Sequence, residues 1–337
     1  MARARKRSRN QKKKLRDTAK RAGFILDKVP ENPILGPNDN NGWEAWQTFN
    51  PAAILLNNDV HFLYRAVGTD GISRLGYAVS HDGLTIDKRL TYPVFEHSPK
   101  GKTFNLYSYA SGGSWGGAED PRIVRVNDED SLYMTYTACH GSGLSVGFSA
   151  IPVNDFINQQ WNWIVPKLIS PLGQIHKNWV IFPEKIKGSY VLLHNLHAND
   201  TSRVRIKYVK NLDSFNPSLD FIESPDPNAL PNRPIAWHNR MRSAGPPPIK
   251  TRYGWLLFYH ATDNKEPSRY KIGAMLLDLK DPSKILRRSS TPILEPTESY
   301  EFNGFKGGIV YASGALVKDG TLFVYYGGAD SYVCAAT

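Results

Sequence analysis

Cysteine is nearly absent from this 337-residue chain, which contains only Cys139 and Cys334. Two cysteines cannot form the disulfide framework of a small secreted domain, and this composition favours a reducing compartment. No stretch approaches the roughly 18 apolar residues that a membrane-spanning helix requires. The N-terminus also lacks the apolar run and small-residue cleavage site of a secretory signal. We therefore expect a cytoplasmic protein with no membrane partner.

Several functional motifs are missing as well. The sequence has no Cys/His cluster at metal-ligand spacing, no Gly-x-Ser-x-Gly nucleophile motif and no glycine-rich nucleotide loop. We therefore expect neither a metal nor an organic cofactor.

The positive charge is concentrated at the N-terminus. The net charge is +11, and residues 1–22 hold eleven Lys and Arg side chains against Asp17 alone. The rest of the chain carries about +1, which is unlike a nucleic-acid-binding surface, so no nucleic-acid partner is expected for it. A basic run of this kind is typical of a solvated, disordered or frayed helical tail. Contact of the tail with RNA, a membrane or another subunit is the alternative.

Beyond residue 22 the sequence repeats one pattern five times and has no long stretch of helical periodicity. Each copy is an apolar strand, a turn and an aromatic-rich strand. The predicted first strands cover residues 51–56, 121–124, 183–186, 248–251 and 314–317. The predicted second strands cover residues 60–64, 132–136, 190–194, 255–259 and 322–326. Four copies are followed by one more predicted strand, at residues 75–80, 144–149, 204–209 and 272–277.

The copies are regularly spaced. The last aligned rings, separated by 72, 58, 65 and 67 residues, are Tyr64, Tyr136, His194, Tyr259 and Tyr326. Each interval has room for a four-stranded blade, and radial closure protects the edges of short sheets. We therefore predict an all-β fold: a single five-bladed β-propeller over residues 23–337 with a basic N-terminal extension over residues 1–22. A pair of β-sandwiches is the alternative.

Polar side chains stand where the aligned strands end, and a propeller would bring these places together around its axis. Carboxylates, cations and aromatic rings in one place suit a sugar ligand. The most conspicuous run is Glu119-Asp120-Pro121-Arg122. It is equally compatible with a turn in which Asp120 precedes a proline and pairs with Arg122.

Nine short motifs in a fixed order connect the chain with a known family. They span residues 49–53, 63–66, 74–78, 116–123, 177–186, 244–251, 254–260, 276–282 and 325–330. Among them are Phe49-Asn-Pro-Ala-Ala, Gly116-Gly-Ala-Glu-Asp-Pro-Arg-Ile and Tyr325-Tyr-Gly-Gly-Ala-Asp. From about residue 32 to the C-terminus the chain resembles glycoside hydrolase family 130. The resemblance implies an enzyme that cuts β-mannosidic bonds on a five-bladed propeller, the fold that the repeat count predicts independently.

The resemblance also implies roles for matched positions. Asp120 matches the family's acid, which protonates the leaving glycosidic oxygen through a hydroxyl of the mannosyl ring. The positions expected to bind the sugar are Asn50, Arg65, Arg122, Tyr270 and Asp330. The positions expected to bind phosphate are Lys177, His194, Arg240 and Arg242.

The family contains both phosphorylases and hydrolases, and the groups opposite Asp120 distinguish them. Phosphate attacks the anomeric carbon without a general base, whereas water needs a carboxylate to activate it. The four phosphate candidates favour phosphorolysis, and Glu184 is the carboxylate that favours hydrolysis. Two departures from phosphorolytic relatives weigh against phosphorolysis: residues 143–149 lack an arginine that those relatives often carry, and residues 238–245 differ from their usual pattern.

We therefore predict a glycosyltransferase-type glycoside phosphorylase of inverting mechanism. It would convert a mannose-containing oligosaccharide and inorganic phosphate into α-mannose 1-phosphate and a shortened sugar. An inverting β-mannoside hydrolase is the first alternative, and a non-catalytic sugar-binding propeller is the second. The linkage, the aglycone and the oligomeric state are left open by the sequence, with a homo-oligomer among the states considered.

Overall fold

The computed structural model describes residues 24–97, 114–140, 143–171, 175–196, 203–212, 222–223 and 237–337. The predicted basic extension over residues 1–22 lies outside the described residues. Within them the fold is all-β, as predicted, and most consecutive strands pair antiparallel. In this part of the chain no helix is both long and apolar enough to cross a membrane.

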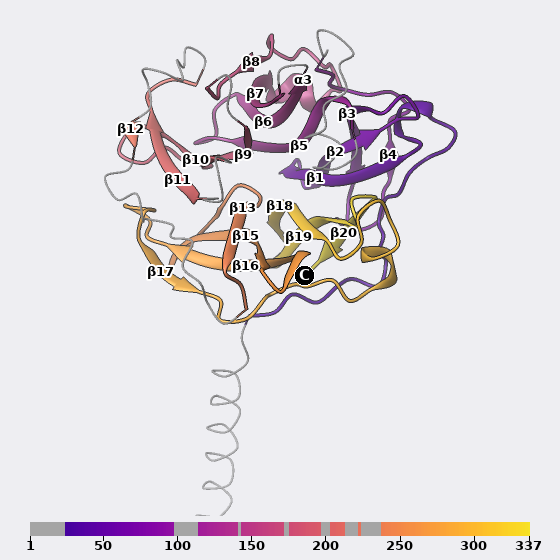
Figure 1. Ribbon diagram of the computed structural model, residues 1–337. Helices are drawn as coiled ribbons and strands as arrows, with labels where there is room; N and C mark the ends of the chain where they lie inside the picture. The colour runs from indigo at the N-terminus through magenta and orange to yellow at the C-terminus, as the bar shows by residue number, and fades with distance from the viewer. Residues whose placement is uncertain are drawn as a thin grey trace, which may run out of the picture.

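The strands form five groups that follow one another along the chain (Figure 1). The first group contains β1 (Gln47–Leu56), β2 (Asp59–Val67), β3 (Ile72–Ser80) and β4 (Lys88–Arg89). The second contains β5 (Gly116–Arg125), β6 (Ser131–His140), β7 (Gly143–Pro152) and β8 (Lys167–Leu168). The third contains β9 (His176–Ile181), β10 (Tyr190–Leu196), β11 (Arg203–Val209) and β12 (Ile222–Glu223). The fourth contains β13 (Arg240–Ala244), β14 (Ile249–Thr251), β15 (Gly254–Asp263), β16 (Glu266–Leu277) and β17 (Ile285–Arg288), and the fifth β18 (Val310–Lys318), β19 (Thr321–Gly328) and β20 (Tyr332–Ala336).

Short elements complete the described chain. A five-residue helix, α3 (Val153–Ile157), follows β7, and two single turns of 3₁₀ helix, η1 (Gly42–Glu44) and η2 (Ser299–Glu301), precede β1 and β18. The first two groups form one eight-stranded sheet because β3 and β5 share a short parallel pairing at Ile72–Gly116 and Ser73–Gly117.

Each predicted second strand lies within a strand of the structure: β2, β6, β10, β15 and β19. The first strand of the third copy differs from the prediction. It is β9 (His176–Ile181), and the predicted segment 183–186 follows it. Pro183 has no N–H to donate to a ladder, which places the strand before it.

The aligned tyrosines have a common structural reason. Tyr64, Tyr136 and Tyr259 each sit directly opposite a glycine of the next strand, at Gly76, Gly147 and Gly273. A Cβ at any of these glycines would come within 2.2–2.4 Å of the tyrosine ring, so the ring occupies the space that a side chain would need. The repeated Tyr–Gly pair is thus a cross-strand packing unit.

Apolar side chains from neighbouring groups form five separate core clusters. One cluster lies between the first and second groups, and others lie between the second and third, the third and fourth, and the fourth and fifth. The fifth cluster combines the last group with the first: Phe62 and Tyr64 pack with Phe323, Tyr325 and Val333. Every group therefore buries apolar side chains against two neighbours, and the first and last groups are neighbours.

The segment before the first group completes the fifth. Asp27 and Thr337 exchange two backbone hydrogen bonds of 2.9 Å, and Val29 and Ile34 donate to the carbonyls of Ala335 and Val333. The Asn32 side chain forms the same pair of hydrogen bonds as a neighbouring strand would. Its amide N–H donates to the Ala335 carbonyl and its amide oxygen accepts from the Ala335 N–H, both at 2.7 Å. Residues 27–35 thus pair with β20 and with Thr337, which follows it.

Candidate active site

The first strand of each group contains a register shift at corresponding places. The shifts lie between Phe49 and Ala52 in β1, Glu119 and Arg122 in β5, Lys177 and Val180 in β9, Met241 and Ser243 in β13, and Ala312 and Gly314 in β18. Bulges of this kind turn a side chain away from its regular direction. Four of the residues within them, Asn50, Asp120, Asn178 and Arg242, line one pocket. A repeated backbone irregularity therefore directs polar side chains to a common centre.

The residue types at the bulges suit their backbone. Asn50, Asp120 and Asn178 have φ values of 46°, 49° and 59°, and Asp330 after β19 has 51°. This left-handed region is costly for most side chains but is tolerated by Asn and Asp. Glycine is required nearby for another reason: a Cβ at Gly327 would lie 2.0 Å from Asn50 Oδ1. The Gly327 backbone and the Asn50 side chain are therefore in close contact.

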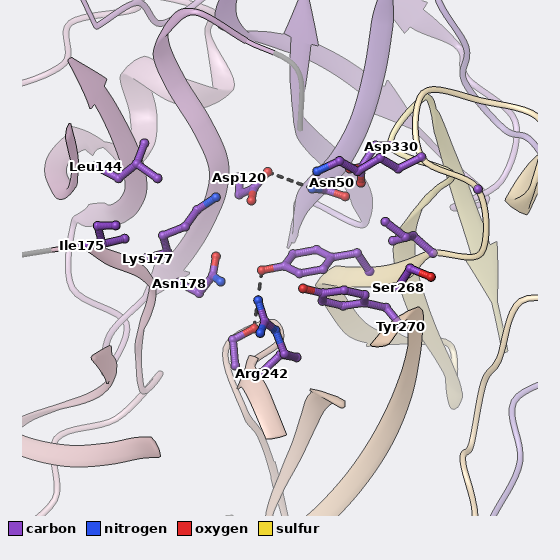
Figure 2. A pocket seen from close by; sticks show the side chains of 15 residues that line it. Asn50, Asp120, Leu144, Ile175, Lys177, Asn178, Arg242, Ser268, Tyr270 and Asp330 are labelled. Carbon is purple, nitrogen blue, oxygen red and sulfur yellow. Dashed lines mark hydrogen bonds between the residues drawn. The ribbon is translucent and has the colours of Figure 1, made fainter. Parts of the chain in front are cut away.

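The pocket has a volume of about 600 Å³. Its polar lining comes from all five groups and their loops: Asn50, Asp120, Lys177, Asn178, Arg242, Ser243, Ser268, Tyr270, Lys306, Tyr311 and Asp330. Leu144, Ile175, Gly307 and Ile309 complete the wall. Figure 2 shows Asp120 and Lys177 across the pocket from Arg242 and Tyr270.

Asp120 is buried among positive charges. Its Oδ1 accepts hydrogen bonds from Asn50 Nδ2 at 2.8 Å and from Arg65 at 3.2 Å. Burial alone would raise the pKa of this carboxyl, but the charges of Arg65, Lys177 and Arg122 and the Asn50 hydrogen bond outweigh burial and lower the pKa to about 2. Asp120 is therefore ionised at neutral pH when the pocket holds no ligand.

Arg65 lies behind Asp120 and is fully buried. Its guanidinium contacts two carboxylates, Glu119 at 3.1 Å and Asp120 at 3.2 Å, and also bonds Ser73 and Ser114. Lys177 Nζ lies 3.5 Å from the other oxygen of Glu119. A buried guanidinium with this many partners is held in a single orientation.

Arg122 lies behind the pocket on the other side of Asp120. It donates to the carbonyls of Asp120 at 2.6 Å and Gly245 at 3.1 Å, and to the Tyr311 hydroxyl at 3.2 Å. The Tyr311 ring stacks on His260 with 3.8 Å between ring centres. Burial and the charge of Arg122 lower the pKa of His260 to about 3, so this imidazole is neutral. Arg122 thus links the Asp120 backbone to the Tyr311 side of the pocket.

Asp330 is the second carboxylate that lines the pocket. Burial and the negative charge of Asp120 raise its pKa to about 6, although Lys306, Arg65 and Lys177 oppose the shift. Burial and the charges of Lys177 and Arg65 lower the pKa of Lys306. The pKa values of the two aspartates therefore differ widely. Asp120 is ionised at all ordinary pH values, whereas Asp330 titrates close to neutrality.

The predicted site residues fall into three sets. Six of them line the pocket: Asn50, Asp120, Lys177, Arg242, Tyr270 and Asp330. Arg65 and Arg122 form the buried layer that contacts Asp120. His194 and Arg240 are not among the lining residues: His194 is buried with its ring 5.4 Å from that of Trp179, and Arg240 lies at the start of β13.

The carboxylate considered for hydrolysis lies elsewhere. Both oxygens of Glu184 accept hydrogen bonds from Lys250, at 2.8 and 2.6 Å, in an exposed position. Glu184 does not line the pocket, so the proximity in sequence to Lys177 was misleading. The strand β9 ends at Ile181, and Glu184 follows in the turn that leads away from the centre.

Some lining residues were not selected from the sequence. Lys306 and Tyr311 flank the start of β18, and Asn178 occupies the β9 bulge. The only sequence signal for Asn178 was its place beside Lys177; Lys306 stands in a loop without a repeat counterpart. Leu144 lines the pocket in the segment 143–149 that lacks an arginine, so this part of the wall is apolar. Among the described residues no group of three or more His, Cys, Asp or Glu side chains could hold a metal ion.

The protein is all-β, and its pocket combines an acidic side chain, cations and tyrosines, a combination that suits a carbohydrate ligand. Comparison with known proteins places it further. The sequence profile described as β-1,4-mannooligosaccharide phosphorylase matches residues 10–337, and the chain belongs to glycoside hydrolase family 130.

Two characterised relatives come from Thermoanaerobacter sp. strain X514. A 1,2-β-oligomannan phosphorylase is 35% identical over 92% of this chain and 96% of its own length. A β-1,2-mannobiose phosphorylase is 33% identical over 93% of this chain and 97% of its own length. The fold is also similar to that of the Listeria innocua β-1,2-mannobiose phosphorylase in complex with β-1,2-mannobiose, with a TM-score of 0.69, 24% identity and coverage of 92% and 96% of the two chains.

Proposed function

We propose that this protein is an inverting glycoside phosphorylase that acts on β-mannosides with inorganic phosphate as co-substrate. The observation that carries the proposal is the composition of the pocket. Three cations, Lys177, Arg242 and Lys306, share it with Asp120, while Glu184 lies outside. Cations that share a pocket with the acid suit a phosphate anion better than a neutral water. The two oligomannan and mannobiose phosphorylases at 33–35% identity support the same assignment.

The reaction needs one bond formed and one broken. A phosphate oxygen attacks the anomeric carbon of the mannosyl unit from the face opposite the glycosidic oxygen. The bond from that carbon to the glycosidic oxygen breaks, the electron pair stays on the leaving oxygen, and the proton of Asp120 goes to it. The products are α-mannose 1-phosphate and the shortened sugar, with no general base required.

Asp120 must be protonated for this step, yet its pKa of about 2 keeps it ionised in the free protein. Phosphate resolves the conflict. An anion beside Lys177 offsets the positive charge around Asp120 and so raises the pKa of Asp120. The co-substrate thereby prepares the acid as well as supplying the nucleophile.

The remaining residues position the two substrates. Asn50, Tyr270 and Asp330 line the pocket and are suited to hold the mannosyl hydroxyls, with Arg65 and Arg122 fixing Asp120 from behind. Lys177 and Arg242 are the phosphate-binding candidates that the pocket retains. The Arg242 guanidinium lies 5.5 Å from the centre of the Tyr270 ring, which fixes its direction.

We also propose that residues 23–337 form one five-bladed β-propeller. The support is the set of five strand groups with a core cluster between each neighbouring pair, including the last and the first. The sequence contains only two cysteines, both of them buried, which supports a cytoplasmic location. The names of the Thermoanaerobacter relatives favour the β-1,2 linkage for this chain as well.

The hydrolase alternative would rely on Asp330, since it is the other carboxylate that lines the pocket. Its pKa of about 6 would suit a base that activates water near neutral pH. Free mannose as the product, independent of phosphate, would establish this alternative.

The deciding experiment measures sugar release from β-1,2- and β-1,4-mannobiose with and without phosphate. Wild type should yield mannose 1-phosphate only when phosphate is present, with the faster rate on the β-1,2 linkage. Asp120→Asn should lose activity by at least about 100-fold, since the proton donor is gone. Asp319→Asn, in the exposed β18–β19 turn, is the matched control and should retain full activity. Binding of mannobiose without turnover in wild type would favour the sugar-binding module.

A further inference from the structure

Glu119 is a completely buried carboxylate that the reaction described above does not use. One of its oxygens accepts a hydrogen bond from Ser114 Oγ at 2.5 Å and lies 3.1 Å from Arg65. The other oxygen lies 3.5 Å from Lys177 Nζ. Glu119 does not line the pocket, yet it contacts Arg65, which bonds Asp120, and Lys177, which lines the pocket.

The contacts of Glu119 connect the two halves of the site. Arg65, on β2, bonds both Glu119 and Asp120, whereas Lys177, on β9, lines the pocket as a phosphate candidate. The carboxylate on β5 therefore bridges the layer behind the acid and the cation expected to meet phosphate. Burying a third carboxylate here costs free energy, and the two cations compensate for it.

Charge around Asp120 is unbalanced without Glu119. The charged and titratable groups of the surrounding elements are Arg65 on β2, Arg122 on β5, Lys177 on β9, Arg242 on β13, His260 on β15, Tyr270 on β16, Lys306 before β18, Tyr311 on β18 and Asp330 after β19. Five of these groups are cations, and among the described residues they surround Asp120 and Asp330. Glu119 supplies the third negative charge.

We propose that Glu119 is a positioning residue for phosphorolysis: a buried negative charge that holds Arg65 and Lys177 and offsets their charge, so that Asp120 can take up the proton it donates. The inference rests on the proposed function. The proposed role has opposite effects on phosphate binding and on the protonation of Asp120, which a general structural role would not have. Glu119 opposes the binding of the phosphate anion while it favours the protonated form of Asp120.

The substitution Glu119→Gln keeps the shape and removes the charge. The amide can still bond Ser114 and Arg65, so the Arg65 position is retained. The extra positive charge should lower the pKa of Asp120 in the reacting complex by about one unit, which reduces kcat at neutral pH about tenfold. The alkaline limb of the kcat profile should move to lower pH by about one pH unit, while the KM for phosphate is unchanged or lower.

The experiment measures kcat and the KM for phosphate across pH for wild type, Glu119→Gln and Glu44→Gln. Glu44 is a matched control: it is also fully buried and pairs with an arginine, Arg89 at 2.7 Å, away from the pocket. Its variant should keep the wild-type pH profile. A Glu119→Gln profile with an unmoved alkaline limb, or a raised KM for phosphate with kcat unchanged, overturns the proposal.

Two further arms keep the test decisive. Should Glu119→Gln fail to fold, Glu119→Asp keeps the negative charge while shortening the side chain, and its alkaline limb should stay at the wild-type pH. A limb displaced to lower pH in that variant overturns the proposal. Absence of phosphorolysis in wild type would instead remove the proposed function, so the two failures are distinguishable.

Discussion

Two aspartates in one pocket have opposite electrostatic surroundings. Asp120 accepts hydrogen bonds from Asn50 and Arg65, and its pKa is about 2, whereas Asp330 has a pKa of about 6. Pairs of titratable groups with divergent pKa values are typical of catalytic sites. At the scale of single residues, the ionised form of Asp330 is therefore energetically unfavourable, and favourable interactions elsewhere in the fold must compensate for it.

The unfavourable ionisation of Asp330 predicts that the stability of the protein depends on pH. The native state holds the Asp330 proton up to a higher pH than the unfolded chain, whose value is 3.8. Stability from this group is therefore lost as pH rises from about 4 to about 6, by on the order of 3 kcal/mol. Asp330→Asn removes the loss, so the unfolding free energy of the variant relative to wild type should increase between pH 4 and pH 7. Urea unfolding at both pH values measures this difference.

The exposed Asp39 provides the control for that measurement, since Asp39→Asn should show no such trend. The opposite shift of Asp120 acts below about pH 4 and does not interfere in this range. A relative stability of Asp330→Asn that is constant between pH 4 and pH 7 would contradict the assignment of a raised pKa to Asp330.

At the scale of elements, the bulges in the first strands determine the site. Asn178 has a φ of 59° in the β9 bulge, and glycine adopts this conformation without steric cost. Asn178→Gly should therefore be more stable than Asn178→Ala by about 1 kcal/mol. Both variants should show weaker activity, because both lose the amide that lines the pocket. Chemical unfolding and the phosphorolysis assay, run side by side, test the two statements.

Asn57 offers a matched pair for the same comparison. It has a φ of 49° in the exposed turn between β1 and β2. Asn57→Gly and Asn57→Ala should differ in stability by a similar amount, with wild-type activity in both. Equal stability of the Gly and Ala variants at Asn178 would show that the β9 bulge relaxes when its side chain changes.

The elements were predicted from the sequence more fully than the site. The aromatic second strands have a period that any alignment of the chain with itself reveals, and in three of the five a tyrosine ring packs against a glycine of the next strand. The bulges have a weaker signal, since a register shift depends on two strands at once. Asn50-Pro51 and Asp120-Pro121 indicate it in the sequence, whereas the bulge at Arg242 has no such marker.

The sequence did not identify Lys306, because this residue reaches the pocket from a loop that has no counterpart in the other repeats. Glu184 illustrates the opposite error. It lies seven residues after Lys177, but the chain has left the central strand by then and the carboxylate pairs with Lys250. Closeness along the chain therefore did not indicate which carboxylate and which cations share the pocket.

At the scale of the whole molecule, residues 27–35 pair with the last strand, β20. The Asn32 side chain is the acceptor for the Ala335 N–H, and Asn32→Ala leaves this donor without that partner. The expected cost is about 1–3 kcal/mol, seen as a melting temperature lower by a few degrees for the entire cooperative transition. Asn40→Ala, at an exposed position before η1, should leave the melting temperature unchanged. A loss confined to a minor early transition would mean that this pairing is independent of the remaining groups.

The same pairing joins segments that the ribosome makes at different times. Asn32 precedes Ala335 by 303 residues, so the earlier segment lacks this partner until the strands between the two residues have been produced. Until then the apolar side chains of the first group that belong to the shared cluster face water, where chaperones and proteases have access to them. The pocket takes Asn50 from the first group and Asp330 from the last. A chain that has not been made as far as Asp330 therefore lacks part of the pocket lining, and its first strand group lacks one of its apolar neighbours.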